Sequence, residues 1–453
     1  MEPNLETQVD VVVVGAGLSG LAAAHAVVAS GRTVRVLEAN DRVGGRTHSQ
    51  TIGNGVFDLG GQWLGPDQPR MLRLCRTLGV ELFATHHEGT KLAWDGQRLV
   101  RSPGTIPRLP PHALLDLHFG VKRLDAVTAR VRRGAARTDP WHRALDARSL
   151  ADWLNENLRT RGAREVVVPA LRVVFGADPE EVSALFAFQY AQAGGGFMKL
   201  IEVEGGAQQW RFVRGAQTVS LAMAEALGGR VRLSAPVRRV RADDAGVEVE
   251  CADERVRASH AIIAVPPPLY AAIDFEPALP VARSQLTQRM PMGGTVKAHV
   301  LYERPFWREA GLSGEAVCTR GPVAVTFDNT SHDGAQPALL AFIVGDTARR
   351  WSARPADARR GEVLDVLRAL FGDAAGRPTH YLEQDWSTQR WSLGCPTANL
   401  PPGSMFVCGD ALDSPRLGRL HFAGTETASS WPGYMEGAVE AGERAAEACL
   451  TAA

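Results

Sequence analysis

Residues 11–46 read VVVVGAGLSGLAAAHAVVASGRTVRVLEANDRVGGR, and this stretch decides the fold. Four valines precede GAGLSG, and the alanine-rich run that follows has helical spacing up to Gly31. The pattern predicts a buried strand, a tight turn and a helix. A second predicted strand, residues 33–37, ends at Glu38. This order of elements is typical of a dinucleotide-binding α/β unit.

The glycines of the turn have distinct roles. Gly15 permits the sharp bend, Gly17 lets the backbone approach a pyrophosphate, and Gly20 lets the helix pack closely. The start of the helix offers free N–H groups and the positive end of a dipole. Glu38 lies where a carboxylate accepts hydrogen bonds from a ribose, in NAD or in FAD. The expected cofactor contacts here are Gly15, Gly17, Leu18, Ser19, Gly20 and Glu38.

The composition argues against several classes of protein. The 453 residues include 50 basic and 50 acidic side chains, so bulk charge favours neither nucleic acid nor an anionic membrane as a partner. No apolar run is long enough to cross a bilayer, and the polar start MEPNLETQVD does not fit a secretory signal peptide. We therefore expect a cytoplasmic protein. The six cysteines are scattered, and we expect neither a disulfide framework nor a metal site.

Further motifs carry a resemblance. Residues 42–46 read RVGGR, residues 57–66 read FDLGGQWLGP, and residues 421–450 contain AGTET followed by WPGYMEGAVEAGERAA. The combination resembles the glutathione-reductase-type FAD fold, and in particular the flavin amine oxidase family. The resemblance implies an α/β and α+β protein, with a Rossmann-like FAD-binding domain and a substrate domain of mixed sheet and helices. The expected FAD-binding segments are 1–75, 212–292 and 391–453, and the substrate-binding segments are 76–211 and 293–390.

The resemblance also implies which residues hold FAD. The glycine pair and tryptophan of GGQW come next to the isoalloxazine ring, and the N–H of Met435 faces the flavin O2 atom. Arg46 offers a guanidinium that can meet a phosphate at two points. The implied contacts are Arg46, Gly61, Gln62, Trp63, Val237, Trp391, Cys395, Gly424, Glu426 and Met435.

Lys297 is the main catalytic candidate. It lies in MGGTVKAHVLYERPFW, a predicted buried strand, and the chain otherwise has only three lysines, Lys91, Lys122 and Lys199. A strand lysine that extends to solvent is the structural alternative. The segment is similar to the amine oxidase segment whose lysine binds a water at flavin N5. Tyr434 is the second catalytic candidate, as one wall of the aromatic cage found in animal members.

The sequence departs from the animal enzymes at one cage position. The other cage tyrosine of those enzymes corresponds to Pro396, so half the cage is missing and the space before the flavin is wider. Cys395 matches the cysteine that carries flavin in the animal enzymes; a thioether is left open, and we expect noncovalent FAD. The implied substrate pocket is Phe197, Leu200, Gln208, Phe327, Phe342, Pro396 and Tyr434.

The expected activity is FAD-dependent oxidative deamination of primary, alicyclic or bulky amines, with O2 reduced to H2O2, as in bacterial members of the family. An L-amino acid oxidase or a polyamine oxidase of the same fold is the alternative within the family. A flavin-binding or redox-sensing protein without turnover is the alternative of another class. The expected partners are a small amine and O2, with no nucleic acid and no membrane, and a homodimer is left open.

Overall fold

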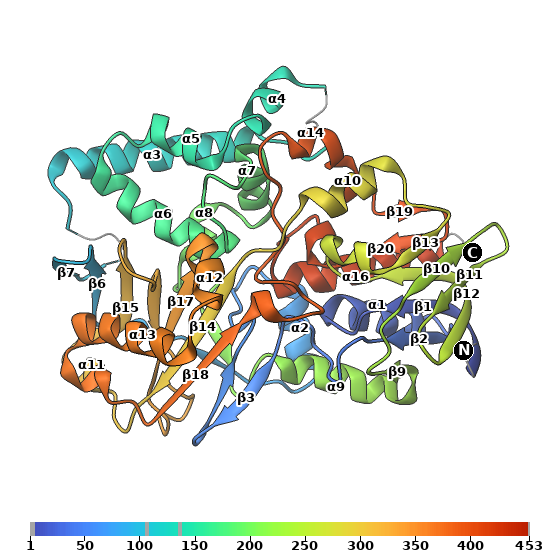
Figure 1. Cartoon of the computed structure of the whole chain (residues 1–453), viewed down its shortest axis with the longest axis horizontal. Coiled ribbons are helices and arrows are strands. Elements are labelled where there is room, and N and C mark those ends of the chain that lie inside the picture. Colours follow the sequence, from blue (N-terminus) through green and yellow to red (C-terminus); the bar gives the residue numbers. More distant parts are fainter. Residues whose placement is uncertain (1–4, 105–107, 135–137, 452–453) are drawn as a thin grey trace.

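The computed structural model describes residues 5–104, 108–134 and 138–451 and contains two large β-sheets (Figure 1). The larger sheet has the order β13-β10-β11-β12-β1-β2-β9, with β20 paired to β12 and β19 to β20. Strands β9, β2, β1, β12 and β20 are parallel, as the strand-turn-helix pattern predicts. The bounds are β1 Leu5–Val14, β2 Val34–Leu37, β9 Val231–Arg232, β10 Arg239–Ala242, β11 Val247–Glu250, β12 Glu254–Ile263, β13 Asp274–Glu276, β19 Arg416–Leu417 and β20 Leu420–Phe422.

The valines of β1 pack into a hydrophobic core on each face of this sheet. Val11 and Val13 pack with helices α1, α9 and α16, whereas Val12 and Val14 pack on the side of the β10–β11 ribbon. Because side chains alternate along a strand, a run of four valines serves both faces. The helices are α1 Leu18–Ala29, α2 Pro69–Thr77, α9 Gln217–Leu227, α10 Val281–Arg289 and α16 Met435–Leu450.

Two glycines allow the close packing of α1. A Cβ at Gly20 would lie 1.9 Å from the backbone oxygen of Gly15, which confirms the packing role predicted for Gly20. A Cβ at Gly442, in α16, would lie 2.1 Å from the backbone oxygen of Ser19. Helix α16 therefore rests directly on the first turn of α1, and the C-terminal signature is brought beside the N-terminal glycine turn.

The second sheet has seven strands in the order β18-β14-β17-β16-β15-β6-β7. Helices α12 and α13 cover one face, and the other face turns toward α6 and the cavity described below. Every residue of β14 and β17 is buried. The bounds are β6 Thr90–Trp94, β7 Leu99–Ser102, β14 Thr295–Leu301, β15 Leu312–Cys318, β16 Val325–Asp328, β17 Ala338–Val344, β18 His380–Asp385, α11 Phe306–Glu309, α12 Gly345–Ser352 and α13 Ala356–Phe371.

A group of helices at the top of Figure 1 closes the molecule above both sheets. Ser149 and Asp152 form a reciprocal capping box at the start of one of them, α5. The helices are α3 Pro111–Arg130, α4 Pro140–Asp146, α5 Leu150–Asn157, α6 Arg161–Phe175, α7 Ala184–Ala193, α8 Phe197–Ile201, α14 Ser404–Cys408 and α15 Asp410–Asp413. Two small sheets, β3 Ser49–Ile52 with β4 Gly55–Asp58 and β5 Leu82–Ala84 with β8 Trp210–Phe212, complete the elements used below.

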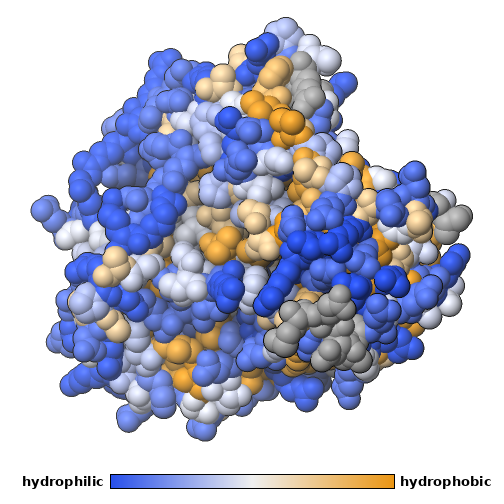
Figure 2. Space-filling model, turned by 45° about the vertical axis from the view of Figure 1, so that its right-hand side comes forward, coloured by the Kyte–Doolittle hydropathy of each residue, from blue (hydrophilic) through white to orange (hydrophobic). Residues whose placement is uncertain are grey.

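The strands of the nine-stranded sheet all come from the segments expected to bind FAD, and those of the seven-stranded sheet come from the other two segments. The domain limits themselves remain a prediction. The face shown in Figure 2 is mainly hydrophilic, with hydrophobic residues in small separate groups. In the part of the chain that the structure describes, no helix is both long enough and apolar enough to cross a membrane.

Candidate active site

A long cavity runs between the two sheets. One end lies at the glycine turn and Glu38, and the other lies at Lys297, Phe342 and Tyr434. The wall is built from segments that are far apart in the sequence, including the start of α1, the GGQW segment, β14 and the start of α16. Such a meeting of a strand-turn-helix with a second domain is a usual place for a cofactor and a substrate.

The glycine turn is shaped for an anionic ligand. Gly15 has φ +102°, a conformation that favours glycine, and a Cβ at Gly17 would have no atom within 4 Å, so this part of the turn faces open space. Helix α1 begins at Leu18 without a side-chain cap. Its first N–H groups therefore remain free for a phosphate. The hydroxyl of Ser19 accepts a hydrogen bond from the backbone N–H of Gly424, which ties the turn to the C-terminal signature.

Glu38 is fixed at the other side of this turn. Its carboxylate accepts hydrogen bonds from the N–H of Ala16 at 2.6 Å and from both the backbone and side-chain nitrogens of Asn40 at 2.8 Å. The side chain is buried, and Val237 lies on the same wall. A carboxylate held in this way presents its remaining lone pairs to a ribose.

Three polar atoms of the wall support the presence of a bound group. Trp63 Nε1, Gln208 Oε1 and Ser392 Oγ are buried and line the cavity, and none has a hydrogen-bond partner in the structure. Buried polar groups are nearly always paired, and an unpaired one costs about 1–3 kcal/mol. These unpaired polar atoms, the free helix start and the open glycine turn together fit a flavin dinucleotide.

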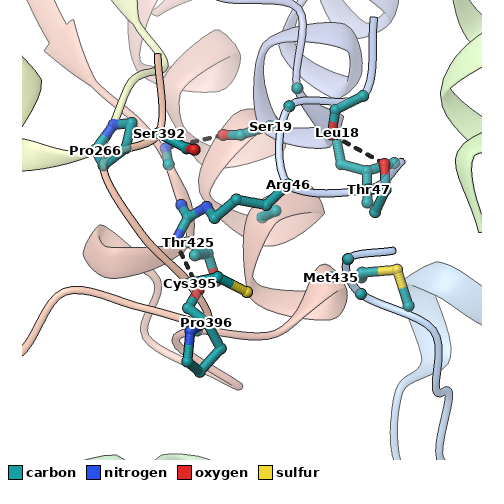
Figure 3. Close-up of a pocket in the computed structure, with 18 of the residues that line it drawn as sticks. Leu18, Ser19, Arg46, Thr47, Pro266, Ser392, Cys395, Pro396, Thr425 and Met435 are labelled. Atoms are coloured by element: carbon teal, nitrogen blue, oxygen red, sulfur yellow. Dashed lines mark hydrogen bonds between the residues drawn. The ribbon is translucent and has the colours of Figure 1, made fainter. Parts of the chain in front are cut away.

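The guanidinium of Arg46 is paired within the protein, and its expected contact with a phosphate stays a prediction. It donates two hydrogen bonds to Glu426, at 2.6 and 3.0 Å. A third goes to the backbone oxygen of Pro396 at 2.8 Å (Figure 3). Burial opposes the charge of Arg46, but Glu426 outweighs burial and raises the pKa of the guanidinium. Arg46 lines the cavity while Glu426 lies behind it, so the pair joins the glycine-rich loop to the C-terminal signature.

Lys297 lies inside the protein and not at the surface. Its side chain is 2% exposed, and its Nζ donates to the backbone oxygens of Asp58 at 2.7 Å and Gly60 at 2.8 Å and to Oε1 of Gln62 at 2.5 Å. The alternative of a strand lysine that extends to solvent is wrong for this residue. Burial lowers the pKa of Lys297 to about 7, although Asp58 and Cys395 favour the ammonium.

Cys395 and Pro396 lie on the cavity wall opposite Met435 (Figure 3). The peptide bond between them is cis. Burial raises the pKa of the Cys395 thiol to about 11, and Arg46 and Lys297 only partly oppose this. The thiol is therefore protonated at neutral pH, which disfavours its attack on a flavin.

Aromatic and aliphatic side chains form the end of the cavity near Lys297. The rings of Trp63 and Phe342 stack at 5.9 Å, and those of Tyr190 and Tyr434 lie 6.2 Å apart. Helix α16 begins at Met435 without a side-chain cap, so free N–H groups also reach this end. Tyr190, Val173 and Val174 line this end but are absent from the residues expected from the sequence.

Most of the predicted site residues lie together. Those that line the cavity are Gly15, Gly17, Leu18, Ser19, Glu38, Arg46, Gly61, Gln62, Trp63, Leu200, Gln208, Val237, Lys297, Phe342, Trp391, Cys395, Pro396, Gly424, Tyr434 and Met435. Four do not. Gly20 lies behind the turn, Glu426 pairs with Arg46, and the Phe197 ring packs on Phe188 in the helical core. Phe327 lies behind the wall, where its ring contacts those of Trp63 and Phe342.

A second group of ligand-type side chains lies away from the cavity. His260, His421 and Cys449 are buried, and one ligand atom of each lies within 4.8 Å of the others. Burial lowers the pKa of His421 to about 4, and His260, Arg416 and Arg444 act in the same direction. Because arginines surround these side chains, a divalent cation is disfavoured, and we assign no metal to them.

Comparison with known proteins decides the family. Residues 18–450 match the model of the flavin containing amine oxidoreductases. The chain belongs to this family. A flavin-containing amine oxidase of Danio rerio is 37% identical over 449 residues, which cover 98% of this chain and 86% of that protein. An amine oxidase A of Sus scrofa is 36% identical over 455 residues, 99% of this chain and 86% of that protein.

Solved structures agree with this assignment. Cyclohexylamine oxidase from Brevibacterium oxydans superimposes with a TM-score of 0.93 at 35% identity, covering 98% of this chain and 99% of that one. Putrescine oxidase bound to putrescine gives a TM-score of 0.93 at 33% identity, covering 98% and 100%. The predicted fold class, the oxidoreductase activity on amines and the FAD cofactor are confirmed.

Proposed function

We propose that this amine oxidase acts on apolar primary amines with a cyclic or branched carbon skeleton. The observation that carries the proposal is the charge of the cavity wall. Within the described lining, Glu38 is the only carboxylate and Arg46 the only guanidinium; Glu38 lies at the far end and Arg46 is paired with Glu426. The second ammonium of a diamine would meet no counter-ion, and the carboxylate of an amino acid would meet no free arginine. Both alternatives within the family are therefore disfavoured.

The shape of the wall favours a bulky group over a flat one. Pro396 stands where the animal enzymes have a tyrosine, and the opposite wall is formed by Tyr434, Tyr190 and Leu200. A proline ring fills less space than a phenol. The cavity therefore has room for a saturated ring, which is thicker than an arylalkyl chain.

The residues of the chain prepare the amine for oxidation. An apolar, aromatic cavity removes water from an ammonium group and lowers its pKa, so the amine binds in its neutral form. Trp63, Phe342 and Tyr434 hold the apolar part and exclude solvent. The glycine turn, Glu38 and the N–H groups at Met435 would hold FAD. When bound, FAD takes two electrons from the C–H bond beside the amine and passes them to O2, giving an imine that hydrolyses and hydrogen peroxide.

The role proposed for Lys297 is to assist the reaction with O2. A cation near the reduced cofactor stabilises the negative charge that develops there. All three hydrogens of the Lys297 ammonium already meet oxygens of the protein. The water expected between Lys297 and the flavin stays a prediction, and it requires that one of these three contacts be exchanged.

A panel of amines tests the proposed specificity. We expect H2O2 production with cyclohexylamine and branched alkylamines, and kcat/KM values at least about tenfold lower for putrescine and for L-leucine, since one lost ion pair costs more than 1.4 kcal/mol. Equal or better turnover of the diamine or the amino acid would overturn the proposal.

The expected cytoplasmic location and the oligomeric state are separate predictions, to be measured by fractionation and by light scattering.

A further inference from the structure

A line of buried polar side chains leads from the cavity wall into the interior. Oε1 of Gln62 receives a hydrogen bond from Lys297, and Nε2 of Gln62 donates to Oδ1 of Asn329 at 3.2 Å. Nδ2 of Asn329 lies 3.1 Å from Nδ1 of His299. All four residues are at most 2% exposed. Lys297 and His299 come from the same face of β14, whereas Gln62 follows β4 and Asn329 follows β16.

Along this line of side chains, the direction of each hydrogen bond depends on the direction of the next one. An ammonium can only donate, so Gln62 must turn its oxygen to Lys297 and its nitrogen to Asn329. Asn329 then turns its nitrogen to His299. His299 accepts through Nδ1 only if its own hydrogen is on Nε2. When Lys297 is an ammonium, this series of hydrogen bonds therefore requires the His299 tautomer that carries its hydrogen on Nε2.

The same series of hydrogen bonds can also run in the opposite direction. A neutral amine has a lone pair, which accepts a hydrogen bond from Nε2 of Gln62 after that amide turns over. Asn329 then turns as well, and its oxygen accepts from a hydrogen on Nδ1 of His299. If only some of the side chains turn, two donors or two acceptors face each other in the interior. The unpaired group then costs about 1–3 kcal/mol of stability. Only the two complete directions avoid this cost between the four side chains, and Nε2 of His299 has no hydrogen-bond partner among the described residues in either direction.

We propose that Gln62, Asn329 and His299 form a hydrogen-bond relay that ties the protonation state of Lys297 to the tautomer of His299. Gln62 and Asn329 transmit the direction, and His299 fixes its far end. The three are positioning residues for Lys297. The inference rests on the proposed function only in taking Lys297 as an active-site group, because the relay itself is read from contacts within the protein.

The surrounding charges leave both directions accessible near neutral pH. Asp58 and Cys395 favour the ammonium of Lys297, whereas burial and Arg211 oppose it, and the pKa is about 7. His299 stays neutral, because burial, Lys297 and Arg211 hold its pKa well below the usual range. A change of tautomer, and not a gain of charge, is therefore what His299 contributes.

NMR of the oxidised FAD-loaded protein tests the relay without turnover. The chain has four lysines, so a sample with 13C,15N-lysine gives few signals, and the one missing in Lys297→Met belongs to Lys297. A second sample with 15N-histidine reports which ring nitrogen of His299 carries hydrogen. We expect the hydrogen of His299 to move from Nε2 to Nδ1 at the same pH at which Lys297 loses its proton. A single His299 tautomer across that titration would overturn the proposal.

Two variants and one control distinguish the loss of the relay from a general destabilisation of the fold. In Asn329→Leu, Gln62 is free to turn its nitrogen to the neutral amine, so the pKa of Lys297 should fall by about one unit, a tenfold change. His299→Phe should lower it as well, because Asn329 is then released, and it serves if Asn329→Leu does not fold. Asn399→Leu is the matched control, since Asn399 is equally buried but its Nδ2 donates to the backbone oxygen of Phe175.

The outcomes separate the relay from a structural role. A Lys297 pKa that changes as much in Asn399→Leu as in the relay variants, or that stays within about 0.3 unit in both relay variants, would contradict the inference. The titrations use no amine substrate, and the amine panel uses no NMR. A failure of the proposed specificity is therefore distinguishable from a failure of the relay.

Discussion

Replacing Lys297 by methionine tests the buried amine most directly. Methionine keeps the length and the apolar packing of the lysine stem. The backbone oxygens of Asp58 and Gly60 lose their hydrogen bonds from Nζ, while the amide of Gln62 can turn to another partner. Each buried acceptor left unpaired costs about 1–3 kcal/mol, so we expect the free energy of unfolding to fall by about 2–6 kcal/mol at alkaline pH.

The difference in free energy of unfolding between wild type and Lys297→Met should depend on pH. The sign of this dependence tests whether Lys297 is buried. The pKa of Lys297 is about 7 in the folded protein, below the usual value of 10.5. Below pH 7 both states of the chain carry the proton, and the folded state bears the full cost of the buried charge. Between about pH 7 and pH 10 the folded state releases the proton while the unfolded state keeps it, so the wild type gains stability as pH rises. The full span is about 5 kcal/mol, from about 1.4 kcal/mol for each of roughly 3.5 pKa units.

The assay is urea denaturation of wild type and Lys297→Met at pH 6.5 and pH 9.5. The wild type should gain stability relative to the variant at the higher pH, because methionine has no proton to release. A difference that is the same at both values, with two-state transitions and equal FAD content, would refute the burial argument. In stopped flow, anaerobic reduction by amine should change little in the variant. Reoxidation by O2 should slow by about tenfold or more, and unchanged reoxidation would remove the proposed role.

Three further predictions follow from the site and its surroundings. Acid precipitation should leave all FAD in the supernatant, because the protonated thiol of Cys395 disfavours a thioether; flavin in the pellet would contradict this. Pro396→Tyr should raise kcat/KM for flat arylalkyl amines relative to cyclohexylamine by about tenfold, and an unchanged ratio would show that this position does not face substrate. Since burial lowers the pKa of His421 to about 4, the wild type should lose stability as pH falls from about 6.5 to 4, while His421→Phe should lose less; parallel pH profiles in thermal unfolding would contradict this.

The sequence predicted the parts of the site that depend on local pattern. The glycine turn, Glu38 and the start of α16 are set by residues next to one another, and each lies on the cavity wall. Lys297 was predictable because its strand is apolar and the chain rarely uses lysine. Backbone geometry and burial pattern act over a few residues, so a single sequence reveals them.

The sequence did not predict features that depend on long-range packing. Arg46 pairs with Glu426, which lies 380 positions away in the sequence, and this ion pair was not predicted. Phe197 turns into the helical core, because the packing of α8 and not its composition decides which face meets the cavity. Strands β6 and β7, from the segment 76–211, join the seven-stranded sheet and were not predicted. Short hairpins leave a weak pattern, and their pairing partner follows much later in the chain.

The site holds two amines whose protonation must differ at one pH. The proposed substrate lies against aromatic and aliphatic side chains that offer its ammonium no counter-ion, so burial alone acts on it and favours the neutral form. Lys297 is buried in the same cavity wall, but three oxygens surround its Nζ, and Asp58 and Cys395 favour its charge. These acceptors favour the charged form of Lys297, and a substrate amine in the apolar part of the cavity lacks them. The oxygens around Lys297 therefore let part of its population stay protonated near neutral pH, beside a neutral substrate amine.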